Sequence, residues 1–238
     1  MKGKVVLITG AAGGIGSKLA EGFGKAGAKL AITDMQEWNA LKGALRIVAD
    51  VTKDQKKIVA ETIKKYGKLD IVICAHGTNM RKPLHQYSKE DWDRIISVNL
   101  SSIFGLMNAA LPEMREGDRF IVISSTQGLV CWNGKGRFSL APYCASKAGL
   151  IALTKAATLD VAKRGITVNA ICPAFVDTPL VKPLKEDKEL YADILARTPL
   201  GRFAKKEEIL GPCLFLASEA ASYITGHALL VDGGWTIQ

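Results

Sequence analysis

A glycine-rich turn at residues 10–16 constrains the fold of this chain more than any other feature. It follows a short apolar run and precedes a segment with helical periodicity. Gly10 permits a tight turn, while Gly14 and Gly16 let a ligand and the following helix approach the backbone closely. The N-terminus of that helix offers free N–H groups to an anion. Strand, turn and helix in this order predict a phosphate cradle, with Ile15 inside it.

Apolar runs of strand length recur along the whole chain, and segments with helical periodicity separate most of them. We expect strands at residues 5–9, 29–33, 45–49, 69–74, 120–123, 166–171 and 228–231. Strands that alternate with helices predict a parallel sheet with helices on both faces. The expected fold class is α/β: a single-domain, doubly wound Rossmann fold over residues 1–238, with a mostly parallel seven-stranded sheet. Ligands should bind at the carboxyl ends of its strands.

Asp34 ends the second predicted strand, about twenty residues after the glycine turn. A carboxylate at this place accepts hydrogen bonds from the hydroxyls of an adenosine ribose. It would also repel a 2′-phosphate, and neither neighbour of Asp34 is an arginine or lysine. We therefore expect NAD rather than NADP as the cofactor. The alternative is that Asp34 only caps its strand.

Residues after the third and fourth predicted strands complete the expected cofactor site. Asp50 and Val51 follow the third strand and could flank the adenine. Ala75 follows the fourth strand and is also assigned to the cofactor. The next residue, His76, is expected to be an anchored loop residue rather than a catalytic base.

Tyr143 and Lys147 lie four residues apart in a predicted helix, so their side chains share one helix face. A free phenol has a pKa of about 10, which is too high for a base near neutral pH. Reaching about 7 takes roughly 4 kcal/mol, which an ammonium and a cofactor cation in a dry pocket could supply. A serine at the end of the fifth predicted strand, where Ser124 and Ser125 follow each other, could then orient a carbonyl. The alternative is an incidental pair, because Tyr and Lys often occur at this spacing.

Composition argues against several other classes of protein. The formal net charge is +9, but no block of five or six like charges occurs, so we expect no nucleic-acid partner. No apolar run approaches the roughly 18 residues of a membrane span, and the N-terminus lacks signal-peptide character. The five cysteines are scattered, which argues against a disulfide framework and against a metal site. We expect a cytoplasmic protein that touches no membrane and holds no metal.

Residues 177–202 form a long excursion after the sixth predicted strand. The segment is charged and interrupted by prolines, so we expect it to bury little core. Long segments of this kind at a strand end often close over a substrate. The sequence therefore predicts a substrate lid at about 177–202.

At this point the chain resembles the classical short-chain dehydrogenase/reductase family over essentially its whole length. The resemblance rests on motifs in register: Thr9-Gly10, Gly14-Ile15-Gly16, Asp50-Val51, Asn99, Ser125, Tyr143 with Lys147, Pro173 with Thr178, and Val231-Asp232-Gly233-Gly234. It implies a nicotinamide-dependent oxidoreductase that acts on a small-molecule substrate. It also implies a homotetramer, because the family is usually tetrameric.

The resemblance implies a role for each matching residue. Tyr143 would exchange a proton with the substrate oxygen, and Lys147 would bind the nicotinamide ribose and lower the pKa of the tyrosine. Ser125 would hold the substrate carbonyl, and Asn99 would support a water of the proton relay. Contacts to the carboxamide side of the nicotinamide would come from Val176 and Thr178.

The sequence departs from the family pattern in two places that matter. After the fourth strand the family usually has Asn-Asn-Ala-Gly, whereas this chain has Cys74-Ala75-His76-Gly77, which removes asparagine hydrogen bonds near the adenosine. The stretch from Ser125 to Tyr143 is several residues longer than usual. The added residues should overhang the substrate pocket.

Two stretches, residues 79–83 and 198–203, look like those of members that act on sugar acids, such as gluconate 5-dehydrogenases and 2-deoxy-gluconate 3-dehydrogenases. Arg81 should lie at the pocket mouth, and Arg137 in the long loop could approach it, so that either could hold a carboxylate. In the alternative, Arg81 pairs with a local carboxylate or faces solvent. Trp132 and Phe138 would then wall a pocket for a neutral sugar or polyol.

Other activities are compatible with this fold, because fold does not determine function. Within enzymes, the alternative is a reductase of 3-oxoacyl thioesters or of another small ketone. Outside enzymes, it is a non-catalytic nucleotide sensor. A sensor has no need to retain Asn99, Ser125, Tyr143 and Lys147, and all are present here. The sequence therefore favours an enzyme.

Overall fold

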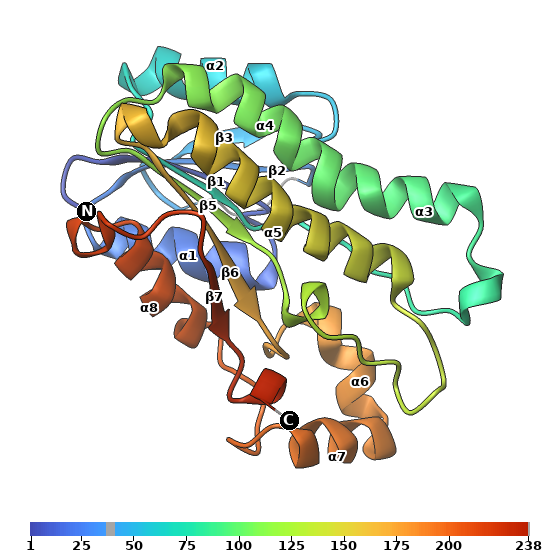
Figure 1. The fold of residues 1–238 in the computed structure, drawn as a ribbon. Coiled ribbons are helices and arrows are strands. Elements are labelled where there is room, and N and C mark those ends of the chain that lie inside the picture. Colours follow the sequence, from blue (N-terminus) through green and yellow to red (C-terminus); the bar gives the residue numbers. More distant parts are fainter. Residues whose placement is uncertain (37–40, 238) are drawn as a thin grey trace.

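The computed structural model describes residues 1–36 and 41–237. They form three layers, a central sheet with a layer of helices on each face (Figure 1). Every strand pairing is parallel, in the order β3-β2-β1-β4-β5-β6-β7. The strands are β1 (Val5–Thr9), β2 (Lys29–Asp34), β3 (Leu45–Val48), β4 (Ile71–Cys74), β5 (Arg119–Ile123), β6 (Thr167–Pro173) and β7 (Ala228–Val231). The predicted α/β class, Rossmann arrangement and seven-stranded sheet are confirmed, and the sheet is entirely parallel.

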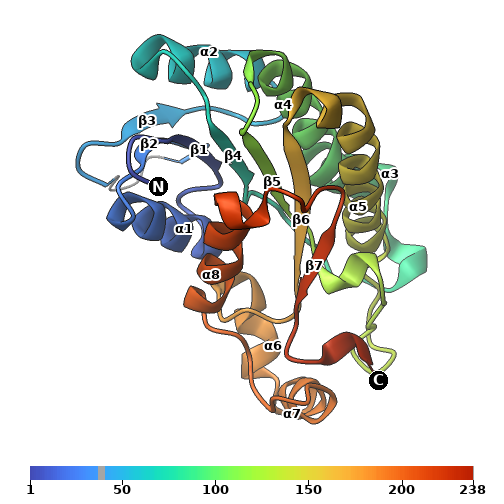
Figure 2. The ribbon, with the colours of Figure 1, turned by 60° about the vertical axis from the view of Figure 1, so that its left-hand side comes forward.

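Helices cover both faces of the sheet. They are α1 (Gly14–Lys25), α2 (Gln55–Tyr66), α3 (Lys89–Ile96), α4 (Ser102–Ala110), α5 (Ala141–Val161), α6 (Lys182–Glu186), α7 (Lys188–Arg197) and α8 (Glu207–Leu216). Helices α2, α4 and α5 lie over one face, and α1 and α8 lie over the other (Figure 2). Helices α6 and α7 lie beyond the carboxyl ends of the strands (Figure 1).

The central strands are mostly apolar because both of their faces are buried. Leu7 of β1 packs into the hydrophobic cluster formed with α2, α4 and α5. Its neighbour Ile8 packs into the opposite cluster, formed with α1 and α8. Burial of such a side chain stabilises the fold by about 1.5–3 kcal/mol. Strand residues therefore serve two cores alternately.

The strand order reverses at β1, which pairs with β2 on one side and with β4 on the other. Such a reversal leaves a crevice at the carboxyl ends of the strands, where ligands bind in folds of this type. Gly10 follows β1 there with a φ of 68°, and a Cβ on it would lie 2.6 Å from the backbone nitrogen of His76. A Cβ on Gly16 would lie 2.1 Å from the carbonyl oxygen of Gly10. Only glycine fits at these two positions.

A continuous helical run, Lys89–Glu113, contains α3, α4 and a π-helical turn at Ser97–Ser101. Among the residues that the structure describes, this run alone is long and apolar enough to cross a membrane, with a mean hydropathy of 1.4. The sequence showed no unbroken apolar run there, because polar residues are interspersed. In the structure the run packs along α2 and α5, as part of the layer that covers the sheet.

The expectation that residues 177–202 bury little core is wrong. Apolar side chains of this segment and of the long loop before α5 form a third cluster together with Phe203 and Trp235. Its buried members are Trp132, Val181, Leu184, Leu190, Ile194, Phe203 and Trp235. Leu190 and Ile194 are four residues apart on α7, so they share the buried face of that helix. Charged residues on the opposite face concealed this pattern in the sequence.

Candidate active site

A cavity of about 130 Å³ lies at the carboxyl ends of β4, β5 and β6, between α5 and the segment 177–202. Nine residues that the sequence assigned to cofactor or substrate line it: Ile15, Ala75, Arg81, Ser125, Trp132, Tyr143, Lys147, Val176 and Thr178. Gly14 lies so close to this group that a Cβ on it would come within 2.7 Å of the Thr178 methyl carbon. The fold thus brings distant parts of the chain together at the predicted edge of the sheet.

Tyr143 and Lys147 lie one turn apart on α5, as expected. The Lys147 ammonium is 5.6 Å from the centre of the Tyr143 ring. Lys147 is only 4% exposed, and its Nζ donates a hydrogen bond to the carbonyl oxygen of Ile123, at 2.8 Å. Burial lowers the pKa of the ammonium to about 8. The site therefore holds a buried cation close to the phenol.

Burial raises the pKa of the Tyr143 phenol above its ordinary value, and the Ser125 hydroxyl and the Arg81 guanidinium only partly oppose this. This direction is opposite to the lowering expected from the neighbouring ammonium. Desolvation of the phenolate is the largest effect, because much of the phenol is withdrawn from water in the cavity wall. The chain by itself therefore keeps Tyr143 protonated.

Ser125 and Ser124 have different partners, which distinguishes their roles. The Ser124 hydroxyl donates to the carbonyl oxygen of Lys147, at 2.8 Å, and so anchors α5 to β5. The Ser125 oxygen accepts from the backbone N–H of Gln127, at 3.1 Å, and its hydroxyl interacts with the Tyr143 phenol. Ser125 is thus the serine that faces the tyrosine.

Asn99 is fully buried in the π-helical turn and does not line the cavity. Its Oδ1 accepts from the backbone N–H of Thr78, and its Nδ2 donates to the Thr78 carbonyl oxygen, both at 2.8 Å. Nδ2 also donates to Ser146 Oγ, at 3.1 Å. A Cβ on Gly77 would lie 3.5 Å from Asn99 Oδ1 and 3.6 Å from Lys147 Nζ, so the amide and the ammonium flank the same backbone.

The acidic residues assigned to the cofactor are held by backbone donors. Asp34 Oδ2 accepts from the backbone N–H of Ala12 in the glycine turn, at 3.0 Å, so this carboxylate does more than cap β2. Asp50 Oδ1 accepts from the N–H and the hydroxyl of Thr52, at 2.9 and 2.7 Å, and these bonds lower the pKa of its carboxyl. Val51 is buried beside it. With the glycine turn, this arrangement fits a dinucleotide.

Arg81 is partly buried in the cavity wall and has no carboxylate partner among residues 1–36 and 41–237. Its Nη2 donates to the carbonyl oxygen of Leu180, at 3.4 Å, and its guanidinium lies 5.9 Å from the centre of the Phe138 ring. Its Nε is buried without any hydrogen-bond partner. The alternative in which Arg81 pairs with a local carboxylate is therefore wrong.

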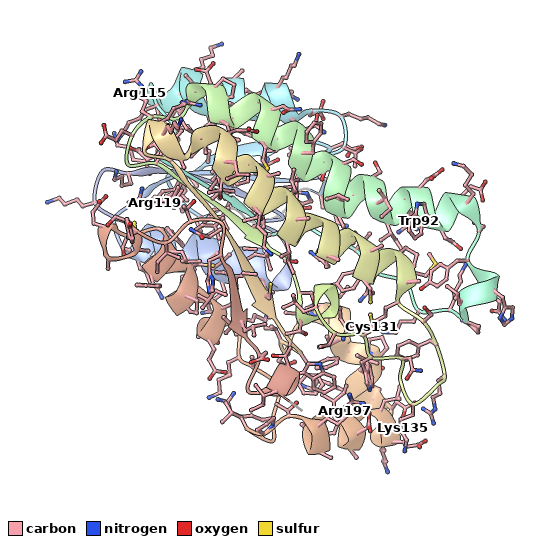
Figure 3. All side chains as sticks on the ribbon, in the orientation of Figure 1. Trp92, Arg115, Arg119, Cys131, Lys135 and Arg197 are labelled. Atoms are coloured by element: carbon pink, nitrogen blue, oxygen red, sulfur yellow. The ribbon has the colours of Figure 1, made fainter. Side chains whose placement is uncertain are left out.

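Arg137 does not approach the cavity, and the expectation that it would is wrong. It pairs with Asp187, at 2.7 Å, and with Glu189, both at the N-terminus of α7. Lys135 of the same loop pairs with Glu189, at 2.8 Å. Figure 3 shows Lys135 beside α7. The long loop thus closes on the segment 177–202 rather than on the substrate.

Trp132 lines the cavity and also joins the loop to α7. Its Nε1 donates to Asp193 Oδ2, at 2.9 Å, and its backbone N–H donates to Gln127 Oε1, at 3.0 Å. No spacing or motif in the sequence indicated Asp193, Lys135 or Gln127 as part of this contact. We name the contact between the loop residues Trp132, Lys135 and Arg137 and helix α7 the loop–lid clasp.

The comparisons with known proteins agree with this geometry. A family described as Enoyl-(Acyl carrier protein) reductase matches residues 10–236. The chain belongs to the short-chain dehydrogenase/reductase family. It is an oxidoreductase of that family, which interconverts CH–OH and carbonyl groups with a nicotinamide cofactor.

Relatives in the short-chain dehydrogenase/reductase family carry different names. The 3-oxoacyl-(acyl-carrier-protein) reductase FabG of Thermotoga maritima is 37% identical over 251 residues, covering 100% of this chain and 99% of that protein. Aldohexose dehydrogenase of Thermoplasma acidophilum, in ligand-free form, has 32% identity and a TM-score of 0.90, covering 100% of this chain and 95% of that one. Gluconate 5-dehydrogenase of Burkholderia cenocepacia, solved with NADP and tartrate, has 31% identity and a TM-score of 0.92, covering 100% and 97%.

The loop–lid clasp predicts that Arg137 controls the mobility of α7. Arg137→Ala removes the pairs with Asp187 and Glu189, and exposed pairs of this kind contribute about 0.2–1 kcal/mol each. Hydrogen exchange of the α7 amides should therefore become about 2- to 30-fold faster. As a control, Lys182→Ala removes only a pair with Glu186 inside α6 and should leave α7 unchanged. Equal exchange of α7 in wild type and Arg137→Ala would contradict the clasp.

Proposed function

We propose that the chain is an NAD-dependent oxidoreductase that interconverts a secondary alcohol and a ketone on a hydroxylated carboxylate, such as a sugar acid. The observation that carries the proposal is Arg81. Its guanidinium lies in the same cavity as Tyr143 and Ser125, and its Nε is buried without a partner. A buried, unpaired donor is costly unless a ligand satisfies it, and a carboxylate matches a guanidinium in charge and shape. A neutral sugar or polyol can accept a hydrogen bond from this donor but offers no negative charge to the guanidinium.

The catalytic residues have distinct roles in this proposal. In the oxidative direction Tyr143 accepts the hydroxyl proton of the substrate, and in reduction it returns a proton to the carbonyl oxygen. Ser125 orients that oxygen from the other side. Lys147 has one backbone acceptor for its three N–H groups, so the others remain available to a ribose hydroxyl. Asn99 holds the backbone between itself and Lys147 in place and supports the proton relay.

The cofactor is held by the glycine turn with Ile15, by Asp34, Asp50 and Val51 on the adenosine side, and by Ala75, Val176 and Thr178 near the nicotinamide. When bound, the oxidised nicotinamide supplies the hydride acceptor and a positive charge beside the phenol. Asp34 favours NAD, because a 2′-phosphate near its carboxylate would be repelled. The gluconate 5-dehydrogenase relative solved with NADP makes this preference a point to test.

The alternative substrate is a 3-oxoacyl thioester or another small ketone. FabG of Thermotoga maritima, at 37% identity over the whole chain, favours this reading. The loop–lid clasp and the unpaired Arg81 favour a short anionic substrate instead. A non-catalytic nucleotide sensor accounts for a nucleotide cavity, but it has no need of Ser125, Tyr143 and Lys147 in the cavity wall. A screen of sugar acids, polyols, secondary alcohols and 3-oxoacyl thioesters with NAD and NADP distinguishes these activities.

We further propose that residues 177–202 act as a substrate lid. The segment contributes Leu180, Val181 and Leu184 to the cavity wall, and the clasp joins it to the loop before α5. We also propose a cytoplasmic homotetramer, on the basis of the family resemblance. Size-exclusion chromatography with light scattering tests the tetramer.

Tyr143→Phe should reduce kcat by at least about 1,000-fold while it changes cofactor affinity by no more than a few-fold. The phenol proton is required only in the chemical step, so its loss should appear in turnover. Steady-state kinetics and calorimetric binding of the cofactor measure the two effects separately. Near-normal turnover in Tyr143→Phe would remove this residue from its proposed role.

Asp34→Ala should reverse the cofactor preference. Loss of the carboxylate removes an acceptor for the ribose hydroxyls, so the Kd for NAD should rise about 10-fold. It also removes the repulsion of a 2′-phosphate, so the Kd for NADP should fall. Binding of both cofactors to wild type and variant is the measurement. Tighter binding of NADP than of NAD to the wild type would show that Asp34 does not select the cofactor.

Arg81→Ala should reduce kcat/KM for an acid substrate by about 10- to 100-fold, because one charge-assisted contact contributes roughly 1.5–3 kcal/mol. The value for a matched neutral analogue, such as a polyol in place of its aldonic acid, should change by less than about 3-fold. Arg137→Ala is the control, since that guanidinium pairs with α7 and should not alter the ratio of acid to neutral substrate. An equal loss on both substrates in Arg81→Ala would contradict a carboxylate contact.

A further inference from the structure

His76 is a buried imidazole for which the proposed mechanism has no use. It follows β4, where Cys74 and Ala75 carry no side-chain amide. Both ring nitrogens have partners: Nδ1 lies 2.5 Å from Thr9 Oγ1, and Nε2 lies 2.8 Å from Ser102 Oγ. Thr9 ends β1 just before the glycine turn, and Ser102 begins α4 just after the π-helical turn. The ring thus connects the end of β1 to the start of α4.

The hydrogen-bond partners determine the tautomer of His76. The Ser102 hydroxyl donates to the carbonyl oxygen of Val98, at 2.7 Å, so towards His76 it acts as an acceptor. Nε2 therefore carries the proton and donates, and Nδ1 accepts the hydroxyl proton of Thr9. Of the two neutral tautomers, only this one satisfies both ring nitrogens.

The surroundings keep the imidazole neutral near physiological pH. Burial, and then the positive charge of Lys147, lower the pKa of His76 to about 3. Cys74 also faces this region, and burial raises the pKa of its thiol, so it adds no negative charge. A group that stays neutral over the working pH range cannot serve as the acid or base of the reaction. Its contribution has to come from its hydrogen bonds.

The backbone around His76 touches both parts of the expected cofactor site. On one side a Cβ on Gly10 would lie 2.6 Å from the His76 nitrogen, so the glycine turn packs directly on this backbone. On the other side Gly77 is flanked by Asn99 and Lys147, and Thr78 exchanges two hydrogen bonds with the Asn99 amide. Residues 75–78 thus separate the glycine turn from the catalytic group. A shift of this backbone would disturb both.

We propose that His76 is a positioning residue, whose neutral imidazole ties Thr9 to Ser102 and so fixes residues 75–78 in the conformation that binds the cofactor. The inference rests on the proposed function in one respect, the use of a nicotinamide cofactor. It assigns His76 no contact with the substrate and no proton transfer. Because the loop is held in place before the cofactor arrives, binding avoids the entropy cost of ordering it.

The test compares variants that keep both, one or neither of the two hydrogen bonds. His76→Ala removes both, His76→Asn can retain the bond to Thr9, and His76→Gln can retain the bond to Ser102. Ser102→Ala removes one acceptor without changing the ring. His85→Ala is the matched control, because His85 is an exposed histidine on the same loop.

Three properties are measured: the Kd for NAD by calorimetry, the pH profile of kcat, and the melting temperature. We expect the Kd to rise about 10- to 100-fold in His76→Ala and less in His76→Asn, His76→Gln and Ser102→Ala. The limbs of the pH profile should keep their positions, because the imidazole does not titrate there. His85→Ala should match the wild type in all three measurements. If His76→Ala fails to fold, the test rests on the other three variants. Each of them should still raise the Kd for NAD above that of the wild type and of His85→Ala.

Two results would overturn the inference. A lower melting temperature with the Kd for NAD within about 2-fold of wild type would make His76 a purely structural residue. Loss of one limb of the pH profile would make it an acid or base. Failure of the proposed function looks different: the wild type would bind NAD but oxidise no hydroxy acid, and the comparison of Kd values would still decide the role of His76. A wild type that binds neither NAD nor NADP would overturn both.

Discussion

The buried ammonium of Lys147 is the constraint on which the site depends. Burial lowers its pKa from 10.5 to about 8, so the unfolded chain holds this proton more tightly than the folded chain. The group therefore opposes folding below pH 8, and the penalty decreases as the pH rises towards 10.5. A fold that maintains such a cost in a cavity beside a tyrosine indicates a functional group. Two hydrogen bonds hold the cation there. The Ser124 hydroxyl anchors α5 through the carbonyl oxygen of Lys147, and Lys147 Nζ donates to the carbonyl oxygen of Ile123.

Much of the fold was predictable because local rules and tertiary packing agree. Glycine at positions 10 and 16 is dictated by close backbone contacts, and the buried strands have no polar face to obscure them. The burial of residues 177–202 was misjudged because the apolar face of α7 is narrow and charged residues surround it in the sequence. Arg137 was misplaced because no local pattern shows which way an irregular loop runs. The partners of His76 come from 67 and 26 residues away, so no sequence window contains them.

The loop before α5 takes part in both the cavity wall and the clasp. It contributes Trp132 to the wall, and its basic residues Lys135 and Arg137 pair with residues at the start of α7. Within the part of the chain that the structure describes, Arg81 is the only arginine or lysine of the cavity wall besides Lys147. The proposed function assigns the recognition of substrate charge to Arg81.

The ionisation of Tyr143 tests the account most directly. The phenolate absorbance of wild type minus Tyr143→Phe can be titrated in the free protein and with saturating NAD. The account predicts a pKa above the ordinary value of about 10 in the free protein, because desolvation dominates. With oxidised NAD it should fall by at least about 2 units, since the positive charge of the nicotinamide then lies beside the phenol. The same pKa in both states would contradict the claim that buried positive charge makes this tyrosine a base.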